Sequence, residues 1–189
     1  MNPLFLIATA LAVLLPLVYV GLQYNALVAL RNYLRVSWSD LETELKRRYD
    51  LIPNLVAVVK GYAAYERAVL ERVTELRDRC AANRGPVASQ TSDEVQLVGA
   101  LKQLFAVVEN YPQLKAAANF LQLQGELVNT EDRIQAARRF YNGNVRDYRN
   151  KCETFPSNLV ARCFGFKAEG DFFSVPPSVA AVPNVDFAS

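Results

Sequence analysis

The sequence predicts an all-α protein: an N-terminal transmembrane helix, an antiparallel bundle of about four long helices, and an extended C-terminal tail. Three observations predict this fold. The chain has no charged residue before Arg31, and its N-terminus is strongly apolar. Most of the remainder shows apolar residues spaced by three or four. Prolines and one turn-rich loop divide the periodic stretches. The predicted segments are 1–23 for the anchor, 24–166 for the bundle and 167–189 for the tail.

The composition excludes several classes of function. The 189 residues suit one domain with a sizeable core. The net charge of +2 gives no concentrated basic surface, so we expect no nucleic-acid partner. Histidine is absent, which excludes Ser-His-Asp and Cys-His catalysis by this chain alone. Cys80, Cys152 and Cys163 fit no zinc motif and are interpreted as small apolar side chains in a reducing compartment.

The stretch from Leu4 to Leu22, "LFLIATALAVLLPLVYVGL", predicts the membrane span. As a helix it extends roughly 28 Å, close to the thickness of the bilayer hydrocarbon. No Lys or Arg precedes it, which favours an uncleaved anchor over a signal peptide. Because positive charges follow the span, we expect a single-pass protein of the cell membrane with its N-terminus outside and its C-terminal domain in the cytoplasm. The opposite orientation is the alternative.

The first soluble helix is predicted from Tyr24 to Tyr49, and the second from Pro53 to about Ala82. The residue before a proline is disfavoured in a helix, and proline itself suits a first helical turn. "YDLIPN" therefore predicts the corner between these two helices. The basic run Lys46–Arg48 is interpreted as a solvated face with ion pairs along its own helix.

The second half of the chain predicts two further long helices. "NRGPVASQTSD" is a loop by composition, and Thr91 with Glu94 fits a capping box that starts the third helix. Pro112 separates this helix from a fourth one, which stops at Pro156. The residues after 166 are rich in Pro, Ser and Val and predict an extended or disordered tail. A coiled coil is the alternative to the bundle, but the prolines and the loop favour packing within one chain.

Three blocks of the sequence resemble the LemA family of membrane-anchored helical proteins: "YNALVALRNYLRVSWSDLETELKRRYDLIPNLVAVVKGYAAYE", "VVENYPQLKAAANFLQLQGELVNTEDRIQAARRFYNGNVRDY" and "FPSNLVARCFGF". The resemblance implies a membrane helix and long antiparallel helices. It implies no known reaction. Family members often occur beside genes for membrane metallopeptidases, so the resemblance implies a membrane protein partner, with a metallopeptidase as one candidate.

Charged residues in gaps of the apolar stripes predict a polar network inside the bundle. Its six candidate members are Arg31, Arg47, Glu66, Glu126, Glu131 and Arg138. A buried charge without a partner is costly, so we expect a glutamate of this set to pair with an arginine and to fix helix register. The alternative is a carboxylate-based metal-binding or enzymatic bundle using the three glutamates. Such sites normally include Glu-x-x-His motifs, and this chain has no histidine, so we expect no metal and no cofactor.

These observations favour an adaptor or scaffold that faces the cytoplasm, and we expect no enzyme activity. Its partners are expected to be the lipid bilayer, through the N-terminal helix, and a membrane protein. The tyrosines of the helices are expected at core or rim positions. A group of exposed tyrosines would instead indicate a protein interface, where tyrosine is enriched. The tyrosines concerned are Tyr49, Tyr62, Tyr65, Tyr141 and Tyr148.

Overall fold

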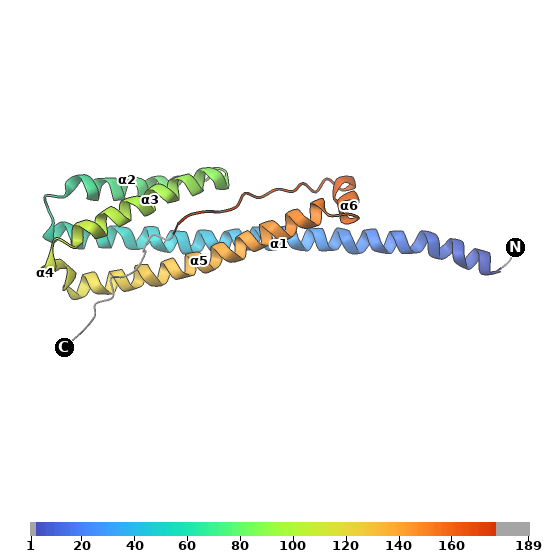
Figure 1. Cartoon of the computed structure of the whole chain (residues 1–189), viewed down its shortest axis with the longest axis horizontal. Helices are drawn as coiled ribbons and strands as arrows, with labels where there is room; N and C mark the ends of the chain where they lie inside the picture. Colours follow the sequence, from blue (N-terminus) through green and yellow to red (C-terminus); the bar gives the residue numbers. More distant parts are fainter. Residues whose placement is uncertain (1–2, 177–189) are drawn as a thin grey trace. The chain divides into compact units, whose positions relative to one another are not determined.

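The computed structural model describes residues 3–176 and contains six α-helices within them (Figure 1). No strand occurs in that range, so the all-α prediction is confirmed. The helices are α1 Pro3–Tyr62, α2 Arg67–Ala82, α3 Val87–Val108, α4 Pro112–Lys115, α5 Ala118–Glu153 and α6 Ser157–Cys163.

The described chain divides into two compact units, and α1 and α5 both run through the pair. The first unit contains residues 3–38 and 141–170. The second contains residues 39–140 and 171–176. The predicted division into 1–23, 24–166 and 167–189 follows other boundaries and stays a prediction.

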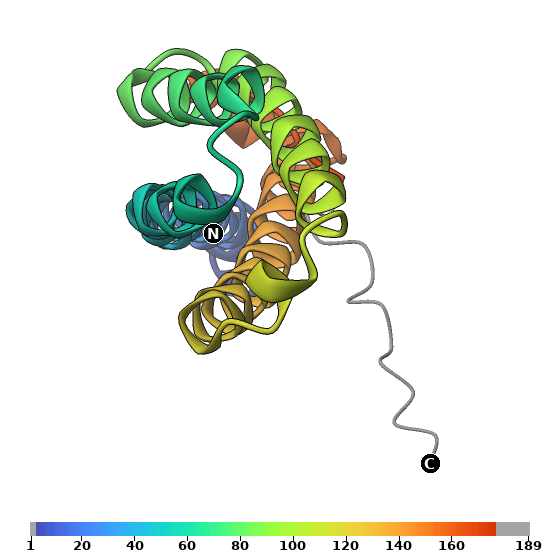
Figure 2. The same ribbon diagram turned by 90° about the vertical axis from the view of Figure 1, so that its left-hand side faces the viewer.

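The second unit is a helical bundle built from the C-terminal part of α1, from α2, α3 and α4, and from the first part of α5. Short connections at 63–66 and 83–86 make α1, α2 and α3 antiparallel neighbours (Figure 2). Apolar side chains at helical spacing, such as Ile52, Leu55 and Val59 on α1, meet in one buried cluster. The same cluster includes Leu97 and Leu101 of α3. The predicted periodicity therefore identifies the core face of these helices.

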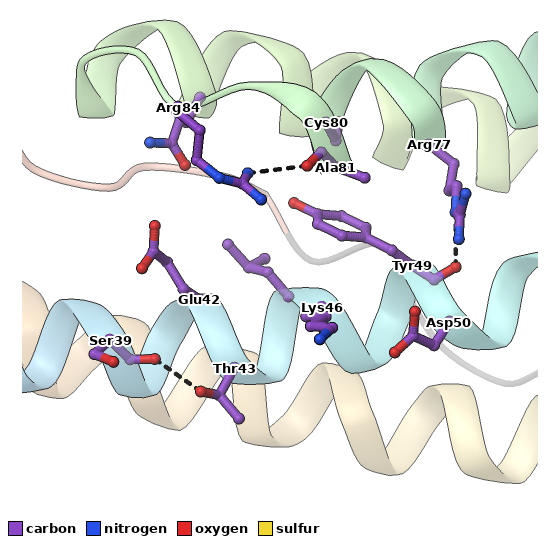
Figure 3. A pocket seen from close by; sticks show the side chains of 12 residues that line it. Ser39, Glu42, Thr43, Lys46, Tyr49, Asp50, Arg77, Cys80, Ala81 and Arg84 are labelled. Carbon is purple, nitrogen blue, oxygen red and sulfur yellow. Dashed lines mark hydrogen bonds between the residues drawn. The ribbon is translucent and has the colours of Figure 1, made fainter.

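The predicted end of the first helix at Tyr49 is wrong, because α1 continues through Pro53 to Tyr62. A proline inside a helix lacks the N–H that would bond to the carbonyl oxygen four residues earlier. Here that oxygen belongs to Tyr49, and Nε of Arg77 on α2 donates to it at 2.9 Å (Figure 3). A side chain from a neighbouring helix thus replaces the lost donor. The corner between α1 and α2 lies at residues 63–66 instead.

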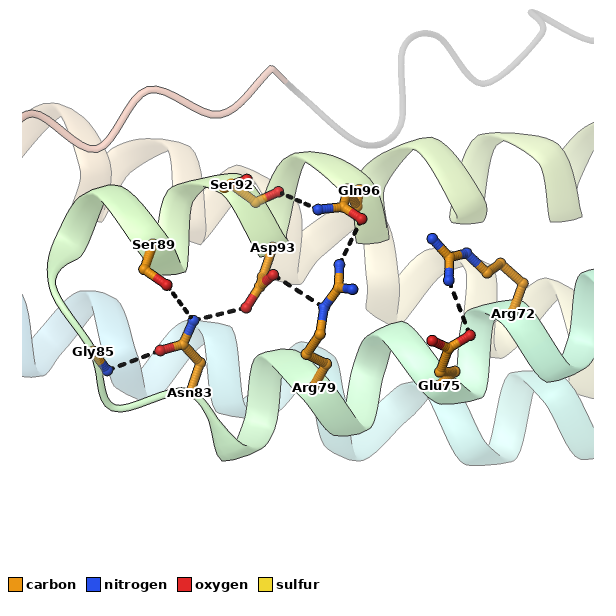
Figure 4. Close-up of polar contacts among 9 residues, drawn as sticks. All are labelled: Arg72, Glu75, Arg79, Asn83, Gly85, Ser89, Ser92, Asp93 and Gln96. Carbon is orange, nitrogen blue, oxygen red and sulfur yellow. Dashed lines mark hydrogen bonds and ion pairs between the residues drawn. The ribbon is translucent and has the colours of Figure 1, made fainter.

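The predicted start of the third helix at Thr91 is also wrong, because α3 already begins at Val87. Thr91 and Glu94 lie inside the helix and form no capping box. The preceding turn is held by Asn83, whose Oδ1 accepts the Gly85 N–H at 2.8 Å (Figure 4). The Asn83 Nδ2 donates to Asp93 Oδ2 at 2.7 Å, which ties the end of α2 to the second turn of α3. The side chain of Asn83 therefore stabilises a connection of four residues, 83–86, where the composition predicts a loop over 83–93.

In the first unit, α6 and the segment after it pack against α1. Gly165, with φ +72°, ends α6 in a left-handed conformation that suits glycine. Two backbone bonds characteristic of this ending follow: Phe166 N–H to Ala161 O at 2.9 Å and Gly165 N–H to Arg162 O at 3.3 Å. The turn buries Phe166 in a cluster with Leu27 of α1. The α6 ending therefore fixes the chain against α1.

Residues 164–176 contain neither helix nor strand. Part of this segment is nevertheless packed, because Phe173 and Val175 are buried in the second unit. Arg138 of α5 donates a hydrogen bond to the carbonyl oxygen of Val175. The remainder of the predicted tail, 177–189, lies outside the described residues.

The N-terminal part of α1 includes the whole predicted span from Leu4 to Leu22. It is long and apolar enough to cross a membrane. Most of the large apolar side chains that the structure describes in this span face outward rather than into a core. The exposed ones are Leu4, Ile7, Leu11, Val13, Leu14, Leu15, Leu17, Val18 and Leu22. The orientation in the membrane stays a prediction.

Because Arg77 supplies the hydrogen-bond donor that Pro53 lacks, we expect substitutions at these two positions to have coupled effects on the free energy of unfolding. Arg77→Met should lower the free energy of unfolding by ~1–2 kcal/mol, because the Tyr49 carbonyl loses its partner. In a Pro53→Ala background the same change should cost less, because residue 53 then has an N–H for that oxygen. Urea titrations of the four proteins in detergent, followed by far-ultraviolet circular dichroism, measure this coupling. An equal cost in both backgrounds would show that Arg77 stabilises the bundle in another way.

Candidate functional site

The second unit contains a cluster of charged and polar side chains inside its core, formed by Arg48, Tyr49, Glu94 and Glu131. We call it the ion cluster. Arg48 is 1% exposed, and its Nη1 donates to Oε2 of Glu131 on α5 at 3.0 Å. Its Nη2 donates to Oε2 of Glu94 on α3, and the Tyr49 hydroxyl donates to the other oxygen of that carboxylate. One turn of α1 therefore bonds to two other helices.

Helical periodicity places these charged side chains in the core. Arg48 lies three residues after Leu45 and four before Ile52, both of which are buried. Glu94 precedes Leu97 by three residues on α3, so it also lies on the buried face. Each charge occupies a position that the apolar stripe would otherwise fill.

The protonation of the cluster follows from its surroundings. Burial by itself lowers the pKa of Arg48, but the neighbouring carboxylates of Glu94 and Glu131 more than offset this and raise it. Burial, followed by the negative charge of Glu94, raises the pKa of Tyr49. Arg48 is therefore a fixed cation and Tyr49 a neutral phenol that donates its proton in a hydrogen bond. Together these two residues donate hydrogen bonds to the buried carboxylates of Glu94 and Glu131.

Among the residues that the structure describes, the ion cluster contains one of the six predicted network members, Glu131. Arg47 lies on the surface of α1 and pairs with Glu44 at 3.4 Å. That pair agrees with the solvated face predicted for the basic run, but for Arg48 this interpretation is wrong, because Arg48 turns into the core. Glu126 is exposed and accepts a bond from Gln122 at 3.1 Å.

The other three predicted members lie in separate surroundings. Glu66 is half-buried and accepts a bond from the Tyr111 hydroxyl at 3.5 Å. Arg138 donates its hydrogen bond to the carbonyl oxygen of Val175. Arg31 belongs to the first unit, where its guanidinium carbon lies 5.1 Å from the centroid of the Phe166 ring.

Sequence reasoning missed Arg48, Tyr49 and Glu94. The signal for Arg48 and Glu94 was present in the periodicity, because both interrupt an apolar stripe as Glu131 does. Local patterns favoured other interpretations. Arg48 is part of a basic run, and Glu94 lies three residues after Thr91 in an apparent capping box.

A polar hollow of about 320 Å³ lies beside the ion cluster, between α1 and the end of α2 (Figure 3). It is lined by cations, such as Lys46 and Arg84, and by anions, such as Glu42. Cys80 also lines it, and burial, followed by the charge of Glu94, raises the pKa of this thiol to about 12. A protonated thiol is a poor nucleophile. The hollow therefore offers mixed charge but no activated nucleophile.

Within residues 3–176 there is no group of three or more Cys, Asp or Glu side chains that is placed to hold a metal ion. Glu66, Glu126 and Glu131 in particular are not brought together as one ligand set. The polar contacts between α2 and α3 are ion pairs and side-chain hydrogen bonds. An example is the ion pair between Arg79 Nε and Asp93 at 3.0 Å (Figure 4).

The tyrosines divide into two groups. Tyr141 and Tyr148 are buried, and Tyr49 is half-buried. Tyr62 and Tyr65 are 48% and 96% exposed at the corner between α1 and α2. We call residues 62–67 the α1–α2 corner. A hollow of about 460 Å³ adjoins it, lined by Val56, Lys60, Ala64, Arg67, Leu70, Glu71 and Thr74.

The sequence is similar to a known protein family and to named proteins of two organisms. A model of the LemA family matches residues 37–187. The chain is 26% identical over 180 residues to the magnetosome protein MamQ of Magnetospirillum gryphiswaldense, in an alignment that covers 82% of this chain and 66% of MamQ. It is 30% identical over 149 residues to Protein LemA of Metamycoplasma hominis, covering 77% of this chain and 66% of that protein. The chain thus spans 66% of the length of the curated relatives it matches.

The enclosed ion cluster predicts a large difference between two glutamates on the same helix. Glu131→Gln should lower the free energy of unfolding by ~3 kcal/mol or more, because it leaves the buried Arg48 without one of its carboxylates. Glu126→Gln, on the exposed face of α5, is the matched control and should change it by less than ~0.5 kcal/mol. Urea titrations measure both. Equal effects would show that the Arg48–Glu131 pair contributes little.

The raised pKa of Cys80 predicts a loss of stability in alkali. Above its ordinary value of 9.0 the unfolded chain releases the thiol proton, whereas the folded chain keeps it until the pH approaches 12. The folded state then binds more protons, so the free energy of unfolding falls as pH rises, by at most ~1.4 kcal/mol per pH unit for this group.

Urea titrations at a series of pH values from about 8 to about 11 measure this decrease in the free energy of unfolding. Cys80→Ala should reduce the slope that begins near the ordinary thiol pKa of 9.0. It should leave the contribution of Cys152, whose pKa burial also raises, and the later contributions of Tyr49 and Tyr148, which begin above 10.0. Cys163→Ala, at an exposed cysteine, is the control and should retain the slope. A slope of the same size in Cys80→Ala would contradict the assignment to Cys80.

Proposed function

Because this chain belongs to the LemA family, we propose that it is a membrane-anchored helical bundle that acts as an adaptor or scaffold for another membrane protein. α1 anchors it as a single-pass protein of the cell membrane, with the N-terminus outside and the bundle in the cytoplasm. The cations that follow the span, beginning with Arg31 and Arg35, support this orientation.

The anchor is supported by the exposure of the apolar part of α1. Side chains such as Leu14 and Leu17 are more than half exposed over a stretch without charge. In water such a surface is unfavourable, whereas a bilayer covers it completely. The same helix then continues into a well-packed bundle. A membrane anchor explains both halves of α1.

A role in protein interaction is supported above all by Tyr65, which is almost fully exposed at the α1–α2 corner. Tyr62 lies beside it, and the adjoining hollow carries cations and an anion, Lys60, Arg67 and Glu71. Exposed aromatic side chains next to a hollow and arginine are typical of protein interfaces. The proposed partner is a membrane protein, with a membrane metallopeptidase as one candidate.

A non-catalytic role is supported by the ion cluster and by the relatives. The two Nη groups of Arg48 and the hydroxyl of Tyr49 donate to carboxylates of the same bundle, so the cluster is suited to holding helices in register. The names of the relatives MamQ and Protein LemA state no reaction. The carboxylate-based metal site remains the alternative function, without a set of ligands in the described chain to carry it.

Site-specific photocrosslinking in native membranes tests the adaptor. A photoreactive amino acid at position 65 should join the full chain to one particular membrane protein. The same amino acid at Phe140, which is exposed on α5, is the control and should not. Tyr65→Ala should lower recovery of that partner about 5- to 30-fold, the range for losing an interface residue worth ~1–2 kcal/mol. Recovery of the chain alone would contradict the adaptor.

The orientation is decided in the same membranes. Protease added to intact cells should leave the bundle uncut, whereas protease added to inverted vesicles should remove it. The reverse result would place the bundle outside and would replace the cytoplasmic partner by one of the cell exterior.

A further inference from the structure

The end of α5 and the short helix α6 form a corner with exposed apolar side chains. Phe155, Leu159 and Phe164 are 74%, 53% and 54% exposed. We call residues 155–164 the α5–α6 corner. It belongs to the first unit, together with the N-terminal part of α1. All three side chains keep more than half of their surface exposed, and solvent is a poor environment for them.

The α5–α6 corner lies beside the last turns of the proposed membrane span. The ring of Phe164 contacts that of Tyr24, with centroids 4.9 Å apart. Phe155 lines a hollow of about 370 Å³ together with Tyr19 and Gln23 of α1. Tyr19 and Tyr24 are only about 7.5 Å apart along a helix axis. That length resembles the headgroup zone, which adds ~5–7 Å on each side of the hydrocarbon.

The charges around the corner suit an anionic lipid surface. Between residues 147 and 167 the chain carries four cations against two anions: Arg149, Lys151, Arg162 and Lys167 against Asp147 and Glu153. Aromatic rings at the level of the headgroups, combined with nearby Lys and Arg, are typical of interfacial segments.

We propose that the α5–α6 corner is a second membrane contact, which inserts Phe155, Leu159 and Phe164 into the boundary between headgroups and acyl chains where α1 leaves the bilayer. The proposal rests on the proposed anchor, because the span sets the height of the corner. A second copy of the chain or another protein is a different occupant for the same surface. Lipid is favoured because the corner adjoins a segment that already requires lipid.

Cys163 allows the proposal to be tested in the full chain. It is exposed on α6, whereas Cys80 and Cys152 are buried, so a thiol-reactive, environment-sensitive fluorophore labels it selectively near pH 7. The labelled protein is inserted into vesicles of phosphatidylcholine and phosphatidylglycerol. Quenchers are nitroxides at the headgroup, nitroxides on the acyl chain, and aqueous iodide. Resistance to alkaline carbonate extraction reports the anchor independently.

We expect a blue-shifted label that is quenched by the lipid nitroxides and protected from iodide. The variant Phe155→Ser with Leu159→Ser should lose most of this quenching, and circular dichroism checks that it is folded. Phe140→Ser, at an exposed phenylalanine of the second unit, is the matched control and should keep it. The quenching of the unsubstituted protein is informative even if the double variant fails to fold.

Three results would overturn the proposal. A label that stays accessible to iodide in carbonate-resistant protein would reject the second contact and leave the anchor intact. A blue shift without lipid quenching would show that protein covers the corner. Full extraction by carbonate would reject the anchor and this contact together.

Discussion

The packing of the second unit depends on two adjacent residues of α1. Arg48 bonds to Glu94 on α3 and to Glu131 on α5, while the carbonyl oxygen of Tyr49 accepts a bond from Arg77 on α2. A single dipeptide therefore contacts all three helices that pack around α1. A guanidinium enclosed in a core is strongly unfavourable unless carboxylates reach it, so only one register of these helices is acceptable. Apolar side chains alone tolerate small shifts between helices far better.

The same dipeptide determines where the bundle turns. Because Arg77 replaces the donor that Pro53 lacks, α1 extends beyond the proline to Tyr62. The corner then falls in a sequence that contains two tyrosines, and Tyr65 becomes almost fully exposed. Had the chain turned at Pro53, this stretch would have been part of a helix with one face in the core. A hydrogen bond from the Arg77 side chain to the backbone of α1 thus determines which aromatic side chains are exposed at the corner.

The sequence predicts those features that depend on periodicity or on solvent. The all-α class and the apolar span follow from the spacing of side chains and from the absence of charge before Arg31. The errors occur where a local rule meets a contact from a distant part of the chain. Pro53 ends a helix by the local rule, but Arg77 lies 24 positions later and offsets the loss. Glu94 fits a capping box by the local rule, but Arg48 requires it in the core. Glu131 was found because nothing local competed with its place in the apolar stripe.

The surfaces left for function are accordingly those that the interior does not use. The two Nη groups of Arg48 and the Tyr49 hydroxyl are directed at carboxylates of the ion cluster, and the thiol of Cys80 is held in its protonated form by burial. One corner of each unit carries exposed aromatic side chains, beside others elsewhere such as Phe140, and the neighbours of the two corners differ. Phe155 adjoins Tyr19 and Gln23 at the end of the proposed membrane span, surroundings that favour lipid. Tyr65 adjoins Arg67 and a hollow in a helical bundle, surroundings that favour a protein. Two chemically distinct corners on one chain, one suited to lipid and one to protein, fit the proposed role of a membrane-anchored adaptor.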